Sequence, residues 1–209
     1  MPSKRIADST IRRLSLYLRF LEEFENAGLT TVSSEELAAR GGTTSAQVRK
    51  DLSFFGSFGK RGLGYQVAEL TQRMRRILGL ERDWRVIIIG VGKIGAALAQ
   101  YEGFQQRGFR VVGLYDSDPA KIGHEMYDLT VRSIESLIED NRERPVDIAV
   151  IAVPASVAQR VVDEVVAAGI KGIMSFAPIQ LQVPPEIKLN TVNMAMELER
   201  LSFSLSNKE

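Results

Sequence analysis

The chain has 209 residues, enough for one large domain or two small ones, and its 44% hydrophobic and 25% charged residues are ordinary for a globular protein. It contains no cysteine and one histidine, which excludes a disulfide framework and leads us to expect no metal site. No apolar run reaches the length that spans a bilayer, and the N-terminus lacks the apolar core of a secretory signal. We therefore expect no membrane partner and a cytoplasmic location.

The net charge of +1 is unevenly distributed along the chain. Residues 1–82 hold fourteen Lys and Arg against nine Asp and Glu, whereas residues 83–209 hold thirteen against seventeen. A basic first part suggests a polyanionic partner, although random scatter of surface charge explains these counts equally well.

Apolar residues at spacings of three and four predict an amphipathic helix over residues 9–27, ended by Gly28. Its inner face comprises Ile11, Leu14, Leu18 and Leu21. A second helix begins at Ser33, whose spacing to Glu36 is that of a capping box, and ends at residues 41–42, a pair of glycines.

A third helix begins at Thr44, where Thr44 and Gln47 repeat the capping-box spacing. Its inner face comprises Val48, Leu52 and Phe55, and its outer face comprises Ser45, Gln47, Arg49, Lys50 and Ser53. Two short capped helices with a glycine-containing turn predict a helix-turn-helix, and these outer groups can donate to phosphates and base edges of DNA. Exposed basic residues are more often only solvated, so the helix pair alone leaves both readings open.

A glycine-rich segment over residues 56–65 carries Lys60 and Arg61 at its centre and closes at Tyr65. Glycines permit the backbone of a tight hairpin, and a basic tip can reach the minor groove or the DNA backbone. The segment therefore predicts the wing of a winged helix. A linking helix over residues 67–78 ends at Gly79, which puts a DNA-binding domain at residues 1–80 and a second domain at residues 81–209.

The second part alternates strands and helices. Strands are expected at residues 86–89, 110–115, 130–132, 148–153 and 172–175, with helices at residues 93–106, 134–140 and 155–168. This alternation predicts a Rossmann-type doubly wound parallel sheet, so the whole chain belongs to the α/β class. A last helix at about residues 194–206 has an apolar stripe, which docks on another subunit or packs on its own sheet; the pattern allows both.

The first strand leads directly into G-x-G-x-x-G, the fingerprint of a dinucleotide pocket, formed by Gly90, Val91, Gly92, Lys93, Ile94 and Gly95. Asp116 lies at the end of the next strand, 26 residues after Gly90, where a carboxylate can accept both hydrogen bonds of a ribose diol. A phosphate on that ribose would be repelled by Asp116, which favours NAD(H) over NADP(H).

Two further strands end at the same carboxyl edge of the sheet and should wall the nicotinamide end. One ends with Ala152, Val153 and Pro154, and the other ends at Ser175 and Phe176. Tyr101 could reach this region or be a partly buried core tyrosine. His124, the sole histidine, lies near the adenosine end, and the chain lacks room for a substrate domain, so the nucleotide is more plausibly a signal than a reagent.

The chain resembles the Rex family of redox-sensing transcriptional repressors over nearly its whole length. The resemblance rests on the motifs at residues 12–14 with Tyr17, 33–35, 48–53, 55–56, 59–65, 90–95 and 169–173. It implies a homodimer that binds palindromic double-stranded operator DNA, senses the NADH/NAD⁺ ratio and is released when NADH binds. It also implies that the C-terminal helix swaps onto the partner subunit.

The same resemblance implies roles for single residues. Arg49 and Lys50 match the family's recognition helix, Lys60 and Arg61 its wing, Tyr101 a tyrosine near the nicotinamide, and Arg13 an arginine that links the DNA-binding domain to the switch. Two positions depart from the pattern. Asn193 stands where members often carry an aspartate that partners this arginine and tyrosine, and Met194 stands where some carry an aromatic residue against the nicotinamide.

We therefore expect an NADH-responsive repressor without catalysis, with NADH and NAD⁺ as ligands. One alternative is a small NAD-dependent oxidoreductase whose basic N-terminal part is an oligomerisation arm. Another is a DNA-binding protein in which the nucleotide is purely structural.

Overall fold

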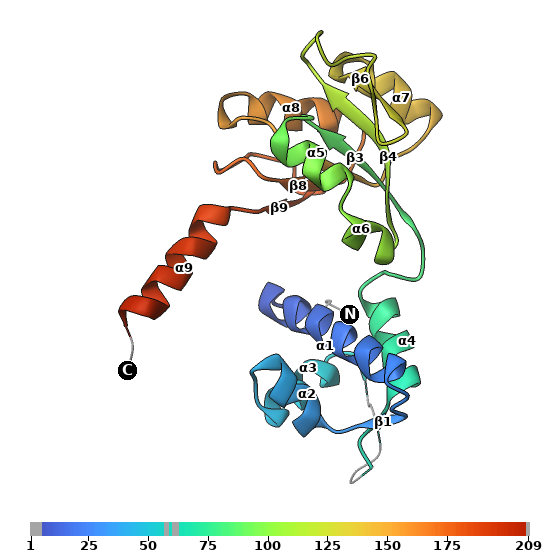
Figure 1. The fold of residues 1–209 in the computed structure, drawn as a ribbon, viewed down its shortest axis with the longest axis vertical. Coiled ribbons are helices and arrows are strands. Elements are labelled where there is room, and N and C mark those ends of the chain that lie inside the picture. The colour runs from blue at the N-terminus through green and yellow to red at the C-terminus, as the bar shows by residue number, and fades with distance from the viewer. Residues whose placement is uncertain (1–5, 57–58, 60–62, 208–209) are drawn as a thin grey trace. The chain divides into compact units, whose positions relative to one another are not determined.

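The computed structural model describes residues 6–56, 59 and 63–207. The chain forms two compact units, Met1–Arg82 and Asp83–Glu209 (Figure 1). Each unit has a hydrophobic core of its own. In the part that is described, no helix is both long enough and apolar enough to cross a membrane.

In its described residues, the first unit packs four helices with a small sheet. Its elements are α1 (Asp8–Asn26), β1 (Thr31–Val32), α2 (Ser34–Gly41), α3 (Ser45–Ser53), β2 (Tyr65–Gln66) and α4 (Val67–Ile77). Strands β1 and β2 pair antiparallel, and α1 contributes Leu14, Tyr17, Leu18 and Leu21 to the core. Ile11, expected on that inner face, is instead 43% exposed, because the face turns toward Thr10 and Leu14 at the start of the helix.

Side-chain caps set where α2 and α3 begin. The Ser33 side chain accepts from the backbone N–H of Glu36, and the Glu36 carboxylate accepts from the Ser33 N–H, so the predicted capping box is confirmed. The Thr44 hydroxyl accepts from the Gln47 N–H at 3.2 Å, but the Gln47 amide donates to Asp51 instead of returning to Thr44. The second capping box is therefore only half formed.

Two glycines between α3 and β2 come close together. Gly59 and Gly64 both have positive φ, and a Cβ on Gly59 would overlap the Gly64 carbonyl oxygen, so their backbones lie against each other. Strand β2 pairs with β1, which anchors the end of this segment to the helix-turn-helix. Lys60 and Arg61, predicted as the tip of the wing, lie outside the described residues.

The second unit is built on a seven-stranded sheet. Its strands are β3 (Trp84–Ile89), β4 (Phe109–Asp116), β5 (Glu125–Met126), β6 (Leu129–Ser133), β7 (Ile148–Ile151), β8 (Gly172–Ser175) and β9 (Lys188–Thr191). Their order is β5-β6-β4-β3-β7-β8-β9, parallel except for β5, so the chain winds outward from β3 in one direction and then in the other. The predicted doubly wound sheet is confirmed.

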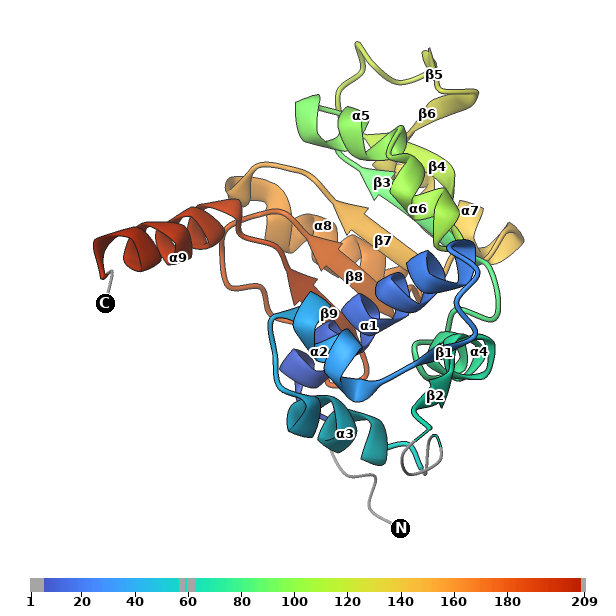
Figure 2. The ribbon, with the colours of Figure 1, turned by 60° about the horizontal axis from the view of Figure 1, so that its bottom comes forward.

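Helices cover both faces of this sheet (Figures 1 and 2). They are α5 (Lys93–Ala99), α6 (Glu102–Gln106), α7 (Leu137–Glu143), preceded by a 3₁₀ turn over Ile134–Ser136, and α8 (Ala155–Ala167). Ile87 and Ile89 belong to the core under α7 and α8, whereas Val86 and Ile88 belong to the core with Leu98 of α5. This alternation follows from the two-residue period of a strand.

The single helix predicted over residues 93–106 is wrong, because the chain breaks between α5 and α6. Tyr101 is extended, with ψ of 101°, and its ring folds over Gly103, where a Cβ would lie 2.5 Å from the ring. The ring also meets Phe104 edge-on, with 5.2 Å between ring centroids. Glycine at position 103 leaves room for the aromatic ring beside the break.

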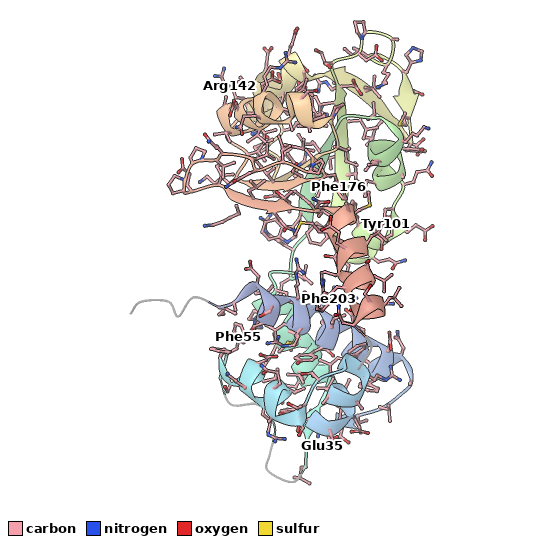
Figure 3. All side chains as sticks on the ribbon, turned by 90° about the vertical axis from the view of Figure 1, so that its left-hand side faces the viewer. Glu35, Phe55, Tyr101, Arg142, Phe176 and Phe203 are labelled. Carbon is pink, nitrogen blue, oxygen red and sulfur yellow. The ribbon has the colours of Figure 1, made fainter. Side chains whose placement is uncertain are left out.

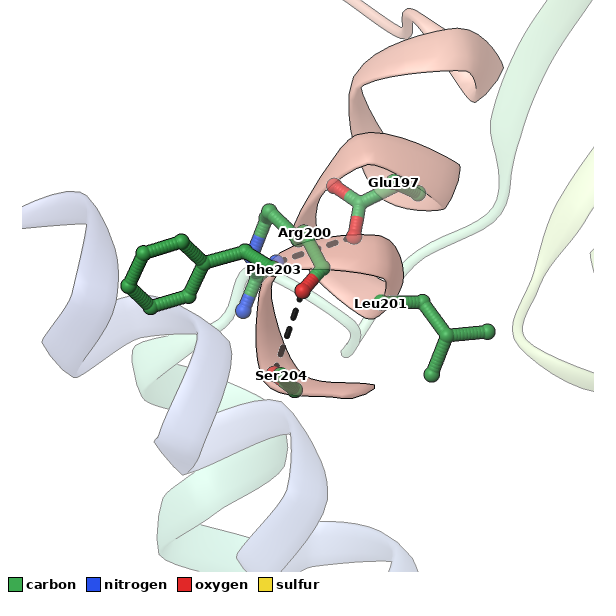
Figure 4. A pocket seen from close by; sticks show the side chains of 5 residues that line it. All are labelled: Glu197, Arg200, Leu201, Phe203 and Ser204. Carbon is green, nitrogen blue, oxygen red and sulfur yellow. Dashed lines mark hydrogen bonds and ion pairs between the residues drawn. The ribbon is translucent and has the colours of Figure 1, made fainter. Parts of the chain in front are cut away.

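The last helix, α9 (Met194–Ser206), extends away from β9 (Figures 1 and 2). None of its residues is buried. Its large apolar residues are 56–69% exposed: Met194, Met196, Leu198, Leu201, Phe203 and Leu205. Figure 4 shows that Leu201 and Phe203 project outward from the helix. The ion pair between Glu197 and Arg200 and the hydrogen bond from the Ser204 hydroxyl to the Arg200 carbonyl both join residues of α9 itself. The alternative in which α9 packs on its own sheet is not met in the described residues.

Candidate functional site

The glycine-rich turn lies between β3 and α5, at the centre of the sheet and at the carboxyl ends of its strands. Gly90 has a φ of +91°, and a Cβ there would lie 2.7 Å from the Ala152 carbonyl oxygen. A Cβ on Gly95 would overlap the Gly90 carbonyl oxygen. Gly92, in contrast, has open space around its Cβ position. Two of the three glycines thus serve close backbone packing, and the third faces the opening.

Asp116, at the end of β4, is the acid that ties this turn together. One carboxylate oxygen accepts from the Val91 N–H at 2.9 Å and from the Lys121 ammonium at 3.0 Å, and the other accepts from the Asp118 N–H at 3.0 Å. Burial acts to raise the pKa of Asp116, but these hydrogen bonds outweigh it and lower the pKa below its ordinary value. The acid is therefore ionised at neutral pH and held rigidly beside the turn.

A cavity of about 240 Å³ opens beside Asp116 and the turn. Six of the predicted binding residues line it: Gly90, Gly92, Asp116, Ala152, Val153 and Pro154. Its volume lies just below the ~300–1,000 Å³ usual for small-molecule pockets. A cavity of this size is large enough for one part of a dinucleotide but not for the whole of it.

Two cations at this cavity were missed by the sequence reasoning. Lys121 follows Asp116 by five residues and pairs with it, and Arg160 lines the cavity from α8. The distance from Asp116 to Lys121 in the sequence was a usable signal for the first. Arg160 was not detectable, because its position depends on how α8 packs across the sheet.

The other predicted nucleotide-binding residues lie outside this cavity. Val91 is buried with its N–H on Asp116, Gly95 is buried under the turn, and Lys93 and Ile94 are exposed on α5. Tyr101 is 59% exposed and lines a separate hollow with Phe104, and Phe176 packs in the core that contains Val86 (Figure 3). Met194 is exposed at the first turn of α9, which Asn193 caps through its side-chain oxygen.

A second candidate site is the outer face of α3. Lys50 and Ser53 are exposed, and Ser45 is half-buried. Arg49 folds back onto α2, donating to the Ser34 hydroxyl at 2.8 Å and lying 3.4 Å from the Glu35 carboxylate. The face therefore combines accessible cations with small polar groups, the composition that suits contacts with DNA phosphates and base edges.

Beneath this face lies a buried carboxylate that the sequence pattern did not reveal. Asp51 is fully buried, and Arg13 donates to both of its oxygens, from Nε at 2.6 Å and from Nη2 at 2.8 Å. Tyr17 and Gln47 donate to it as well, at 3.1 and 2.8 Å. Burial acts to raise the pKa of Asp51, but the bonds from Arg13, Gln47 and Tyr17 outweigh it and lower the pKa. Arg13, predicted to serve a switch, is thus bound to α3.

Comparisons with known proteins agree with this arrangement. Residues 81–179 match the family model described as a CoA binding domain, and residues 5–53 match the one described as a putative DNA-binding protein N-terminus. The redox-sensing transcriptional repressor Rex of Carboxydothermus hydrogenoformans is 46% identical over 98% of this chain and 99% of its own length.

Two solved structures of RSP, a Rex-family repressor, are also similar. Its complex with β-NAD⁺ and operator DNA has a TM-score of 0.92 and 37% identity, covering 97% of this chain and 94% of RSP. Its complex with β-NADH has a TM-score of 0.87 and 36% identity, covering 96% and 94%. With this identity maintained over nearly all of both units, the chain belongs to the Rex family of redox-sensing transcriptional repressors.

Proposed function

We propose that this protein binds operator DNA through residues 1–80 and NAD(H) through residues 81–209, and that NADH releases it from the operator. The single observation that carries the proposal is the joining of two sites in one chain. A helix-turn-helix with a cationic outer face precedes a doubly wound sheet whose glycine turn is fastened to an ionised Asp116. RSP, built on the same plan, has been crystallised with both kinds of ligand.

The residues at the cavity fit an adenine dinucleotide. Asp116 keeps acceptor capacity for a ribose diol, Gly92 leaves room for backbone approach to a pyrophosphate, and Lys121 and Arg160 supply positive charge. The bound coenzyme would differ between its two forms only in the nicotinamide ring, which is positively charged when oxidised and neutral when reduced. The nucleotide is a ligand in this proposal and is not consumed.

The DNA-binding residues in this proposal are Ser45, Gln47, Arg49, Lys50 and Ser53 on α3, with Lys60 and Arg61 from the wing. Recognition helices contact base edges chiefly through their N-terminal residues, which places Gln47 at the bases and Lys50 nearer the phosphates. To reach DNA, Arg49 must break its hydrogen bond to Ser34 and its ion pair with Glu35, so these two contacts compete with its contact to DNA.

A homodimer follows from α9. A helix with no buried residue and six exposed large apolar side chains lacks a partner within its own unit, and the apolar set is large for a monomer surface. We propose that α9 swaps onto a second copy of this chain, bringing Asn193 and Met194 to the partner. Two copies then present two α3 helices to a palindromic operator.

The switch rests on linkage. NADH lowers operator affinity only if it binds more tightly to the conformer that fits the operator poorly, and a coupling of ~1–3 kcal/mol, or roughly 5–150-fold in affinity, is typical. Arg13, Tyr101 and Asn193 are the proposed switch residues. Because Arg13 is held by Asp51, its effect would pass to α3 through that carboxylate. We propose a cytoplasmic location for this protein, because a repressor must reach its DNA.

A titration tests the proposal directly. Operator-bound protein is titrated at several NADH/NAD⁺ ratios, with DNA binding read by fluorescence anisotropy. Release that follows the ratio supports the sensor, whereas an operator affinity independent of NADH leaves the nucleotide a structural part. Turnover of alcohols or hydroxy acids with NAD⁺ that disappears in Asp116→Ala would favour an oxidoreductase.

A further inference from the structure

The buried carboxylate of Asp51 has four hydrogen bonds, and their origin is informative. Three come from α1, two from Arg13 and one from Tyr17, whereas the fourth comes from Gln47 on the outer face of α3. A buried carboxylate is costly to desolvate unless it is fully paired, so a stable core alone would be served as well by apolar residues. The hydrogen bond from Gln47 suggests that the charge of Asp51 also acts on the outer face of α3.

Asp51 fixes which way the Gln47 amide faces. An ionised carboxylate only accepts hydrogen bonds, so Gln47 must present its Nε2 to Asp51, at 2.8 Å. With the amide reversed, its oxygen would face a carboxylate oxygen, and two acceptors would repel. Arg13 keeps Asp51 ionised through its two bonds, so the amide is held in one orientation.

The orientation determines what Gln47 offers to DNA. A glutamine amide carries two N–H donors and one oxygen, and with one N–H on Asp51 it retains one donor and one acceptor. Adenine presents the matching pair in the major groove, the N7 acceptor beside the N6 amino donor, whereas guanine presents two acceptors. Gln47 is the third residue of α3, at the end of a recognition helix that meets base edges.

We propose that Asp51 is a positioning residue that orients Gln47 to read adenine at one position of each operator half-site. This inference rests on the proposed DNA-binding function and adds a base identity to it. Replacing the adenine should weaken binding roughly 5- to 150-fold, the range of one good bidentate contact. Asp51 itself touches no DNA, because it is fully buried.

The test selects operators from a randomised DNA duplex library with the full-length protein and its variants. The wild type should enrich a palindrome with an adenine in each half-site that Gln47→Ala no longer selects, while the other positions keep their preference. In Asp51→Asn the charge is lost and one of the two oxygens becomes a donor, so the Gln47 amide is no longer held in one orientation, and the preference for adenine at that one position should weaken.

The matched control is Glu23→Gln, the same acid-to-amide change at an ion pair between α1 and α2. It should leave every base preference unchanged. A folded Asp51→Asn protein with an unaltered adenine preference overturns the proposal, and so does retention of that preference in Gln47→Ala. If Asp51→Asn does not fold, Gln47→Ala still tests whether Gln47 reads the adenine. That variant should fold, because Arg13 and Tyr17 still pair Asp51. If the wild type enriches no sequence at all, the DNA-binding function fails instead.

Discussion

Gly90 and Gly92 lie two residues apart in the same turn, yet alanine at the two positions should act in opposite ways. Alanine at position 90 must adopt a φ near +91°, which costs ~1–2 kcal/mol, and its Cβ would lie 2.7 Å from the Ala152 oxygen, roughly 0.6 Å inside the ~3.3 Å of an ordinary C···O contact. Overpacking of this kind costs ~1–3 kcal/mol, so the total is about 3 kcal/mol.

Alanine at position 92 meets no atom within 4 Å, and φ there is −75°, so it should be neutral or stabilise the apo protein by ~0.4–1 kcal/mol. Its Cβ would, however, occupy the space through which the backbone approaches the pyrophosphate. NADH affinity should then fall at least about tenfold, which is 1.4 kcal/mol.

The assay is thermal unfolding with and without NADH. At roughly 2–4 °C per kcal/mol for a chain of this size, Gly90→Ala should lower the apo Tm by about 6–12 °C. Gly92→Ala should leave the apo Tm unchanged or slightly raised and lose most of the stabilisation by NADH. Wild-type NADH affinity in Gly92→Ala would refute the assignment of this turn to the pyrophosphate, and an unchanged apo Tm in Gly90→Ala would refute the packing argument.

Four further outcomes follow from the sites. Asp116→Ala should reduce NADH affinity in a fluorescence titration while operator binding without nucleotide stays near normal; loss of both would mean that the two units are not separable. Lys50→Ala and Arg61→Ala should weaken operator binding in gel shifts and leave NADH binding intact, an outcome that reduced NADH affinity in either would contradict. Asn193→Asp restores a carboxylate before α9, so operator release should need less NADH; superimposable release curves would remove the ion-pair argument. Because the pKa of Asp51 is lowered in the folded protein, its charge stabilises the fold above about pH 4, and this stabilisation is lost as pH falls through the folded pKa. Urea unfolding at pH 6 and pH 3 should therefore show a smaller pH dependence in Asp51→Asn than in the wild type, and equal dependence would argue against the paired carboxylate.

Features governed by neighbours in the sequence were predictable. The Ser33 cap, the order of strands and helices around β3 and the position of Asp116 depend on local spacing, and the structure has all three. Strand β9 was missed because a short, polar edge strand has no buried face to produce an alternating pattern.

Features governed by distant contacts were not predictable. The break at Tyr101 comes with an extended backbone at that residue and a ring that lies over Gly103, whereas the helical pattern runs through both residues. Asp51 sits in a charged stretch of α3 that indicates a solvated face, and its burial is tolerable because Arg13, 38 residues earlier, and Tyr17 approach it from α1 and donate to it along with Gln47. The half-formed cap at Thr44 has the same cause, since Asp51 takes the Gln47 amide.

Because the apolar side chains of α9 are exposed, we expect this helix to be stable only when the protein is assembled. A helix of 13 residues with no packed face is close to the length below which helices are marginal in water, ~12–15 residues. Dilution that separates α9 from the second copy of the chain should therefore unfold this helix. Helical content would then rise with protein concentration, and the amount of repressor in a cell would set how much of it is fully folded.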